Sequence, residues 1–317
     1  MGSNHGRYFI SRLLKVSKSV MRVAYNTLHA WDRAIGLGFD EGAHNYLVRR
    51  AAAAYDMVDA PDEIYYARHY GDFIEEKLNS NGLKSQARLL DLACGQGRMI
   101  SELVGRDLNF KNIMGVDFSD EVLSRARKNL YGLSTDADIK LESSDLLDYV
   151  RSVEDKSVDV LLLLEVLYML PNPELVLSEI SRTLTSTGMA FFSVRTDYYY
   201  GLSALKQGLF NKLQEFEVAT ADELFNSGVL LNWTSSERIF NDFAASYGLV
   251  IQGCTAIGSC SGIPGDPLES IVRPSELSSV DQNSLLKLEK FMGDKYPDSG
   301  RYLLFSAVKA KLHKDIQ

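Results

Sequence analysis

The sequence predicts a doubly wound α/β fold with a mostly parallel, seven-stranded sheet. Short apolar runs alternate with amphipathic helical patterns from about residue 87 to residue 195. This alternation is typical of a parallel sheet with right-handed crossovers. The first apolar run breaks into a glycine-containing turn at residues 93–97, directly before a helical pattern. Such a turn brings backbone N–H groups close to a ligand.

The expected elements follow from the periodicity and from the residues that start and stop it. Asn172 and Pro173 predict a helix start, because asparagine caps helices and proline suits the first turn. We expect strands at about 87–94, 112–117, 139–144, 158–165, 188–195, 249–257 and 301–310. We expect helices at about 97–107, 120–131, 173–185, 235–247 and 279–293.

Three stretches fall outside this predicted core. Residues 1–80 read as helical, and we expect them to form an N-terminal cap. The domain then spans residues 81–317, interrupted by lid insertions at about 197–233 and 259–299. The second insertion is polar and contains serine, proline and glycine, which is typical of inserted loops.

The turn after the first strand favours one kind of nucleotide-like ligand. A dinucleotide fingerprint requires a third glycine where Ile100 stands, and the chain has no G-K-[ST] sequence. Asp91 precedes the turn, and its carboxylate would repel a pyrophosphate. The same carboxylate suits a ligand that carries an amine.

Four segments in this order resemble the motifs of the class I S-adenosylmethionine-dependent methyltransferases. They are DLACGQG (91–97), IMGVDFS (113–119), ESSDLLD (142–148) and VDVLLLLEVLYML (158–170). The resemblance covers about residues 85–195 and resumes at the end of the chain. Ala93 stands where the usual pattern has its first glycine. The resemblance implies a final strand that runs antiparallel to the others, with insertions that shape the acceptor pocket.

The resemblance also implies S-adenosylmethionine as the cofactor and S-adenosylhomocysteine as the product. Asp91 would contact the methionine amine, Asp117 the two ribose hydroxyls and Asp145 the adenine amino group. Gly95 and Gly97 would let the cofactor approach the backbone. The residues expected to line the cofactor are Asp91, Ala93, Cys94, Gly95, Gly97, Asp117, Phe118, Asp145, Leu146 and Glu165. We interpret Cys94 as a small spacer and not as a nucleophile.

The candidate catalytic residues are Glu165, His69 and Tyr168. No histidine lies between residues 70 and 312, so a histidine base would have to come from the N-terminal region, from His69 or His44. The alternative for His69 is an ordinary surface histidine of a helix. Glu165 ends an apolar strand and would face the cofactor amine or the acceptor, where a carboxylate could also act as the base. The alternative for Glu165 is a turn or cap residue.

Aromatic and basic residues follow the predicted fourth and fifth strands. Tyr168 and Tyr198–Tyr200 could stack on a planar acceptor or surround a cation. Of the last three tyrosines, we expect one in the core and one in the pocket. Arg195 and Arg273 could clamp a substrate carboxylate, although each reads more readily as a surface residue.

Composition limits the function classes further. The formal net charge is −8, which argues against a nucleic-acid partner. No run of about 18 apolar residues exists, so no membrane span is expected. The chain has three cysteines and no spacing typical of a metal site, so we expect a cytoplasmic protein without a metal.

The N-terminal stretch has an apolar seam from Ile10 to Ile35 and five basic residues before Asp32. We favour a helix that packs on the domain or on a second copy, which would give a homodimer. The alternatives are a membrane-surface helix and a transit peptide.

Together these features favour methyl transfer to a small-molecule acceptor. The scarcity of histidine favours a nitrogen, sulfur or carboxylate acceptor over histidine-assisted O-methylation. One alternative is a methyltransferase acting on RNA or protein, but the chain has Glu165-Val-Leu-Tyr168 where N-P-P-Y or D-P-P-Y would stand. The other is a non-catalytic subunit that retains the fold, against which the intact Asp91, Gly95 and Asp117 argue.

Overall fold

A computed structural model describes residues 56–82, 85–106, 108–170, 173–206, 208 and 246–310. The predictions for the seam helix near residues 10–35 and for His44 lie outside these residues. The helix predicted at 235–247 and the later part of the insertion at 197–233 also fall almost wholly outside them.

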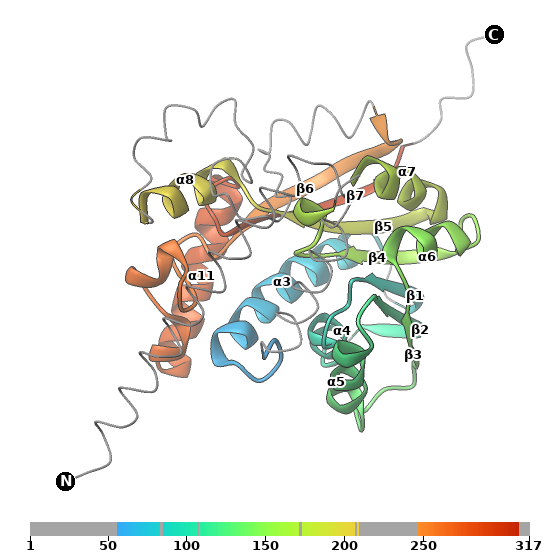
Figure 1. Cartoon of the computed structure of the whole chain (residues 1–317), viewed down its shortest axis with the longest axis horizontal. Coiled ribbons are helices and arrows are strands. Elements are labelled where there is room, and N and C mark those ends of the chain that lie inside the picture. The colour runs from blue at the N-terminus through green and yellow to red at the C-terminus, as the bar shows by residue number, and fades with distance from the viewer. Residues whose placement is uncertain are drawn as a thin grey trace, which may run out of the picture.

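The described chain forms one seven-stranded sheet with the strand order β3-β2-β1-β4-β5-β7-β6 (Figure 1). β1 to β5 are parallel, and β7 runs antiparallel to both β5 and β6. The predicted fold and its antiparallel last strand are therefore confirmed. The strands are β1 (Ser85–Leu92), β2 (Asn109–Asp117), β3 (Asp138–Ser143), β4 (Val158–Leu163), β5 (Leu184–Val194), β6 (Leu249–Ile257) and β7 (Tyr302–Lys309).

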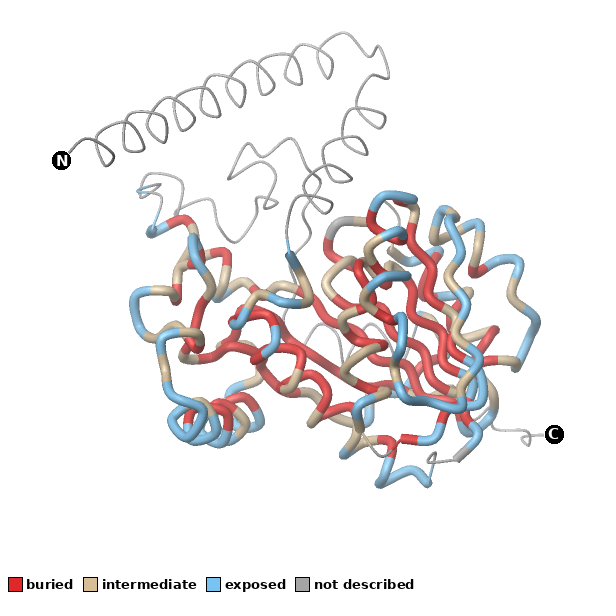
Figure 2. The backbone as a smooth tube through the Cα atoms, turned by 90° about the horizontal axis from the view of Figure 1, so that it is seen from below, coloured by how far each residue is buried: buried red, intermediate tan, exposed pale blue. Residues whose placement is uncertain are grey.

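Helices cover both faces of the sheet, because successive side chains of a strand point to opposite faces. Leu162 and Phe191 lie in one apolar cluster, whereas their neighbours Leu161 and Phe192 lie in the other. Figure 2 shows the strands as the most continuously buried part of the chain. The first face carries α3 (Pro61–Ser80), α4 (Arg98–Val104), α5 (Asp120–Leu130) and α11 (Ser279–Lys295). The second face carries α6 (Leu146–Ser152) and α7 (Pro173–Thr183).

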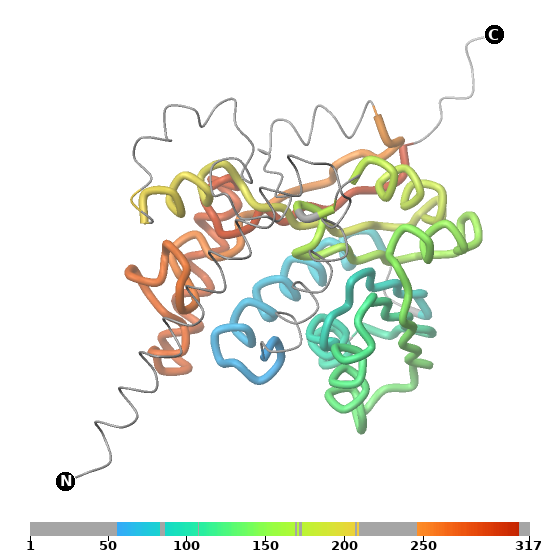
Figure 3. The backbone as a smooth tube through the Cα atoms, in the orientation of Figure 1, coloured from blue at the N-terminus to red at the C-terminus, as the bar shows by residue number. Residues whose placement is uncertain are grey.

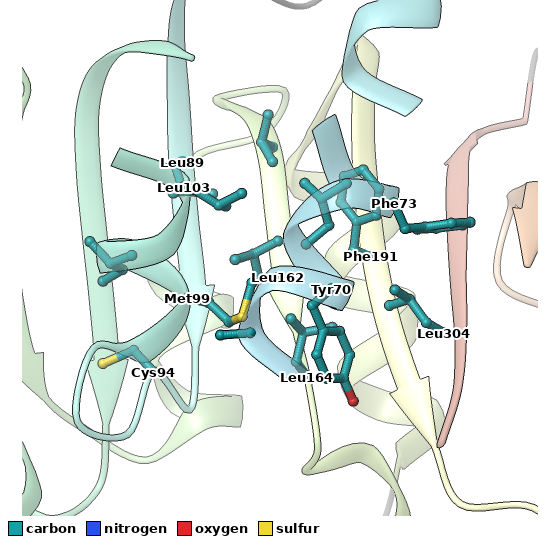
Figure 4. Packing of buried hydrophobic residues seen from close by; sticks show 14 of the residues in the cluster. Tyr70, Phe73, Leu89, Cys94, Met99, Leu103, Leu162, Leu164, Phe191 and Leu304 are labelled. Atoms are coloured by element: carbon teal, nitrogen blue, oxygen red, sulfur yellow. The ribbon is translucent and has the colours of Figure 1, made fainter. Parts of the chain in front are cut away.

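α3 packs on the sheet as part of the hydrophobic core. Its residues Tyr65, Tyr70 and Ile74 are fully buried, and the Phe73 ring meets the Phe191 ring edge-on at 6.4 Å between centroids. Figure 4 shows Phe73 beside the strand residue Phe191, with Tyr70 in the same group of buried side chains. The division of the chain at residue 80 remains a prediction, but this helix packs as part of the sheet domain.

The segment between β6 and β7 packs beside α3. It contains two short 3-10 turns (Pro267–Ser270 and Pro274–Glu276) followed by α11, which packs on β6 and contacts α3. Figure 3 follows the chain from α3 through the sheet and back to this segment. α8 (Asp197–Lys206) follows β5 and contacts the first of the 3-10 turns. The segment predicted as an insertion thus carries a helix of the core face.

The differences from the expected elements have local causes. β1 and β4 end earlier than predicted, because Ala93 and Glu165 adopt left-handed backbone conformations with φ of +58° and +59°. α6 was not predicted. Asp145 begins this helix by accepting hydrogen bonds from the N–H groups of Leu147 and Asp148. Among the described helices, none is long and apolar enough to cross a bilayer.

We predict that truncation of α3 on its buried side destabilises the whole domain. Ile74→Ala should lower the free energy of unfolding by about 2–5 kcal/mol, because Ile74 is 0% exposed and its removal leaves a cavity. Ile64→Ala, on the same helix at 46% exposure, is the matched control and should change it by less than about 0.5 kcal/mol. Urea unfolding measures both variants. Equal small effects would show that α3 is dispensable to the core.

Candidate active site

The turn after β1 is shaped by three left-handed residues. The φ angles of Ala93, Gly95 and Gly97 are +58°, +56° and +81°. Glycine adopts this region without steric cost, and alanine does so at a modest one. The Cys94 N–H donates to Val116 O at 2.9 Å, and the Gly97 N–H donates to Cys94 O at 3.0 Å. The turn therefore folds back against β2 before α4 begins.

Asp117 ends β2 and is bound to that turn. Its Oδ2 accepts the Gly95 N–H at 3.1 Å, and its Oδ1 accepts the Ser119 N–H at 3.0 Å. The side chain is buried, with 8% exposure. Each carboxylate oxygen can accept two hydrogen bonds. This fixed carboxylate therefore suits two adjacent hydroxyl groups, such as those of a ribose.

Asp91 lies beside Asp117, at the end of β1, and is nearly inaccessible at 3% exposure. Its Oδ2 has no hydrogen-bond partner among the described residues. Burial, followed by the negative charge of Asp117, raises the pKa of Asp91 to about 8. A cationic group would lower this pKa and satisfy the oxygen. The environment of Asp91 thus fits the amine predicted from the sequence.

The remaining predicted cofactor residues surround the same strand ends. Asp145 is exposed and caps α6, with its Oδ1 2.8 Å from Leu147 N. Phe118 and Leu146 are half-buried next to the two acids. Cys94 is buried, and burial raises the pKa of its thiol, which agrees with a spacer role. A contact between Asp145 and an adenine remains a prediction.

Glu165 follows β4 and is held by an arginine that sequence reasoning missed. Its Oε1 accepts Arg98 Nη2 at 2.7 Å, and its backbone N–H donates to Ser193 Oγ at 2.7 Å. Arg98 also forms an ion pair with Glu63 of α3. The only signal in the sequence was a basic residue directly after the glycine turn. Its partners, 35 and 67 residues away along the chain, could not be identified from it.

The charge state of Glu165 follows from these contacts. Burial acts to raise its pKa, but Arg98 and then Arg301 more than offset this, so its pKa lies below the usual value. Glu165 is therefore ionised at neutral pH. A carboxylate with a lowered pKa is a weak proton acceptor, so its negative charge is of more use than its basicity.

His69 lies on the buried side of α3 and not on the surface, so the surface alternative is wrong. It is 1% exposed, and its Nδ1 lies 3.7 Å from Glu289 Oε2 of α11. Burial lowers the pKa of His69 to about 4, so the ring is neutral. Glu289 itself accepts hydrogen bonds from Tyr65 Oη at 2.7 Å and Ser261 Oγ at 2.8 Å. Whether His69 takes part in catalysis remains a prediction.

Tyr168 and the residues after β5 gather around Arg195. The Arg195 guanidinium lies 4.1 Å from the Tyr199 ring centroid, 4.6 Å from that of Tyr302 and 5.4 Å from that of Tyr168. Its Nη2 donates to Tyr302 Oη at 2.9 Å. Arg195 is therefore half-buried, and the interpretation of it as a surface residue is wrong. Tyr200 is buried at 3% exposure while Tyr199 faces Arg195.

The other predicted clamp, Arg273, is already engaged. It forms ion pairs with Asp62 at 3.4 Å and with Glu276 at 3.1 Å. Within the described residues, no group of three or more histidine, cysteine, aspartate or glutamate side chains is arranged to hold a metal ion.

The comparisons with known proteins agree with this geometry. Residues 83–230 match the family model described as a methyltransferase domain. Curated relatives include the ubiquinone biosynthesis O-methyltransferases of Neisseria meningitidis and Thiobacillus denitrificans, each 29% identical over 106 residues. Each match covers 33% of this chain and 43% of the relative, so the chain matches less than half of each relative's length. Residues 83–230 thus form an S-adenosylmethionine-dependent methyltransferase domain.

Solved structures of similar fold include an S-adenosylmethionine-dependent methyltransferase from Mesorhizobium loti. It is 17% identical with a TM-score of 0.45, covering 71% of this chain and 92% of that one. Another is the geranyl diphosphate C-methyltransferase from Streptomyces coelicolor A3(2). It is 17% identical with a TM-score of 0.46, covering 76% of this chain and 77% of that one.

We predict that the raised pKa of Asp91 makes the cofactor-free protein less stable as the pH rises. The pKa is 3.8 without perturbation and about 8 in the folded protein. Between these values the folded protein keeps a proton that the unfolded chain releases, so stability falls with rising pH and levels off above about pH 8. Asp91→Asn is neutral at every pH and removes this dependence.

The Tm difference between Asp91→Asn and the wild type should therefore increase from about pH 4 to pH 8. The increase should be roughly 2–4 °C for each kcal/mol of stability that the wild type loses over this range. Thermal unfolding across this range measures the effect. Asp136→Asn, at an exposed position, is the control and should show a flat difference. A flat difference for Asp91→Asn as well would mean that Asp91 is ionised throughout.

Proposed function

We propose that this chain, with its methyltransferase domain at residues 83–230, transfers the methyl group of S-adenosylmethionine to a small-molecule acceptor. The observation that carries the proposal is the pair of acids around the glycine turn. Asp117 is fixed by the Gly95 N–H at 3.1 Å, and the Oδ2 of Asp91 is buried with no hydrogen-bond partner among the described residues.

These residues fit the cofactor. Asp117 would hold the ribose hydroxyls, Asp91 the methionine amine, and Gly95 and Gly97 would allow close approach of the ligand to the backbone. A Cβ on Gly97 would lie 3.1 Å from the Leu130 side chain, and the φ of +81° there would strain a larger residue. Phe118, Leu146 and Asp145 would surround the adenine. When bound, the cofactor supplies an electrophilic methyl group on a positively charged sulfur.

The acceptor side of the proposed site lies at the ends of β4 and β5. Glu165 keeps a negative charge there, which stabilises nearby positive charge in a partly buried environment. Because its pKa is lowered, we do not assign Glu165 as a strong general base. We infer that the acceptor attacks with a lone pair of its own and that positioning supplies most of the rate. Nitrogen, sulfur, carboxylate and already ionised oxygen acceptors meet this condition.

Two observations support a small-molecule acceptor over RNA or protein. The chain carries a formal net charge of −8, whereas nucleic-acid enzymes usually present a basic surface. The curated relatives are named for O-methylation in ubiquinone biosynthesis, a small-molecule reaction. A cytoplasmic location, expected from the cysteine content, forms part of the same proposal.

The decisive experiment follows labelled methyl groups from S-adenosylmethionine into a cell extract of the source organism, separated into small molecules, RNA and protein. Label in the small-molecule fraction would support the proposal, and mass spectrometry would then identify the acceptor. Label in RNA or protein would replace it with the macromolecular alternative. Binding of the cofactor without any transfer would favour the non-catalytic alternative.

We predict that Asp117→Ala weakens cofactor binding. Loss of hydrogen bonds to a charged acceptor removes about 1.5–3 kcal/mol for each bond, so the Kd for S-adenosylhomocysteine should rise by at least about tenfold. Asp136→Ala removes the same group at an exposed position and should leave the Kd unchanged. Isothermal titration calorimetry measures both. An unaltered Kd for Asp117→Ala would reject the assignment of this acid to the ribose.

A further inference from the structure

We propose that Arg195 and the tyrosines around it form a subsite for a carboxylate group of the acceptor. This inference rests on the proposed methyltransferase function and names the class of acceptor. Three observations support it: the aromatic enclosure of the guanidinium, the lack of an ion-pair partner among the described residues, and the position of Arg195 at the end of β5.

The first observation is the enclosure of Arg195. The rings of Tyr168, Tyr199 and Tyr302 lie 5.4, 4.1 and 4.6 Å from the guanidinium carbon, measured to the ring centroids. Aromatic rings cover the faces of a guanidinium, and its N–H groups then point outward along its edges. Nη2 is directed to Tyr302 Oη at 2.9 Å, so this nitrogen also has a fixed direction. The arrangement holds Arg195 in one orientation.

The second observation is the balance of charge at this edge of the sheet. Arg98 is paired with both Glu63 and Glu165, and the buried Arg301 is paired with Asp266 at 2.7 Å. Across the described residues, by contrast, no carboxylate lies within ion-pair distance of Arg195. Its Nη1 is buried and has no hydrogen-bond partner there.

A half-buried guanidinium in this state has an unmet requirement for an anion. Taking charged donors out of water is costly unless a partner satisfies them. The neutral tyrosine rings, and the Glu165 carboxylate beyond ion-pair distance, compensate only part of this cost. One guanidinium balances one negative charge, and its planar edge matches a carboxylate. These properties point to a singly charged, planar acid group on the ligand.

The third observation is position. Arg195 directly follows β5, and two residues earlier Ser193 Oγ accepts the backbone N–H of Glu165. Glu165 in turn holds Arg98, the neighbour of Gly97 in the cofactor turn. Because β7 is antiparallel to β5, its first residue, Tyr302, is brought to the same edge. The proposed subsite is therefore connected to the cofactor turn through a short series of contacts.

The test uses the full-length protein saturated with S-adenosylhomocysteine, and benzoate as the probe. Benzamide is the neutral control, since it has the same shape without the charge. Ligand-observed NMR titration gives the two affinities for the wild type, Arg195→Gln, Arg195→Lys and Arg127→Gln. Arg127 is exposed on α5, so Arg127→Gln makes the same substitution away from the proposed subsite.

We expect the wild type and Arg127→Gln to bind benzoate at least about tenfold more tightly than benzamide, a difference of about 1.4 kcal/mol. Arg195→Gln should lose this preference, and Arg195→Lys should keep part of it. If Arg195→Gln does not fold, the selectivity of the wild type and the partial selectivity of Arg195→Lys still decide the question.

Two outcomes would overturn the subsite. One is that wild-type protein binds S-adenosylhomocysteine but binds benzoate no more tightly than benzamide, or does not bind benzoate at all. The other is unchanged benzoate selectivity in Arg195→Gln. Failure of the wild type to bind S-adenosylhomocysteine would instead refute the proposed function. The affinity for S-adenosylhomocysteine should be the same in all four proteins, which separates the two proposals.

Discussion

The hydrogen bond from the Gly95 N–H to Asp117 is the contact on which the geometry of the candidate site depends. It joins the turn after β1 to the end of β2, and the register of these parallel strands brings the two segments to the same edge. The left-handed conformations of Ala93, Gly95 and Gly97 allow the turn to make this contact. Asp91 is buried beneath the same turn, so one backbone arrangement positions both acids.

A second constraint joins the core to the proposed acceptor side. Arg98 begins α4 and binds Glu63 of α3 and Glu165 after β4, so a single guanidinium ties three elements together. The packing of α3 on the sheet places Glu63 within reach of Arg98. The ion pair between Arg98 and Glu165 keeps Glu165 ionised. The same guanidinium binds Glu63, so the packing of a helix that lies earlier in the sequence is linked to the charge state of a site residue. Core packing and electrostatics are thus coupled here.

Local patterns in the sequence were sufficient for the sheet and for the position of two acids at strand ends. Apolar runs predicted all seven strands, and Asp91 and Asp117 stood at the ends of two of them, because both signals arise within a few residues. The burial of His69 and the role of α3 in the core depend on contacts with α11 and the sheet, far away in the sequence. The pair formed by Arg195 and Tyr302 joins residues 107 apart, and only the antiparallel β7 brings them together. No local pattern carries that information.

These contacts also place acidic and basic side chains in different parts of the candidate site, so that each proposed ligand would meet one sign of charge. The positively charged amine of the cofactor would meet Asp91, and its sulfonium would meet the negative charge of Glu165 where the acceptor side begins. An acceptor would meet Arg195, whose described surroundings contain tyrosines and no carboxylate partner. A carboxylate at Arg195 and a sulfonium near Glu165 would each be neutralised locally, so bringing the two substrates together would leave no uncompensated charge in a partly buried space. Without a general base of raised pKa at Glu165, this division of charge is what would orient a nucleophile that already has its lone pair available.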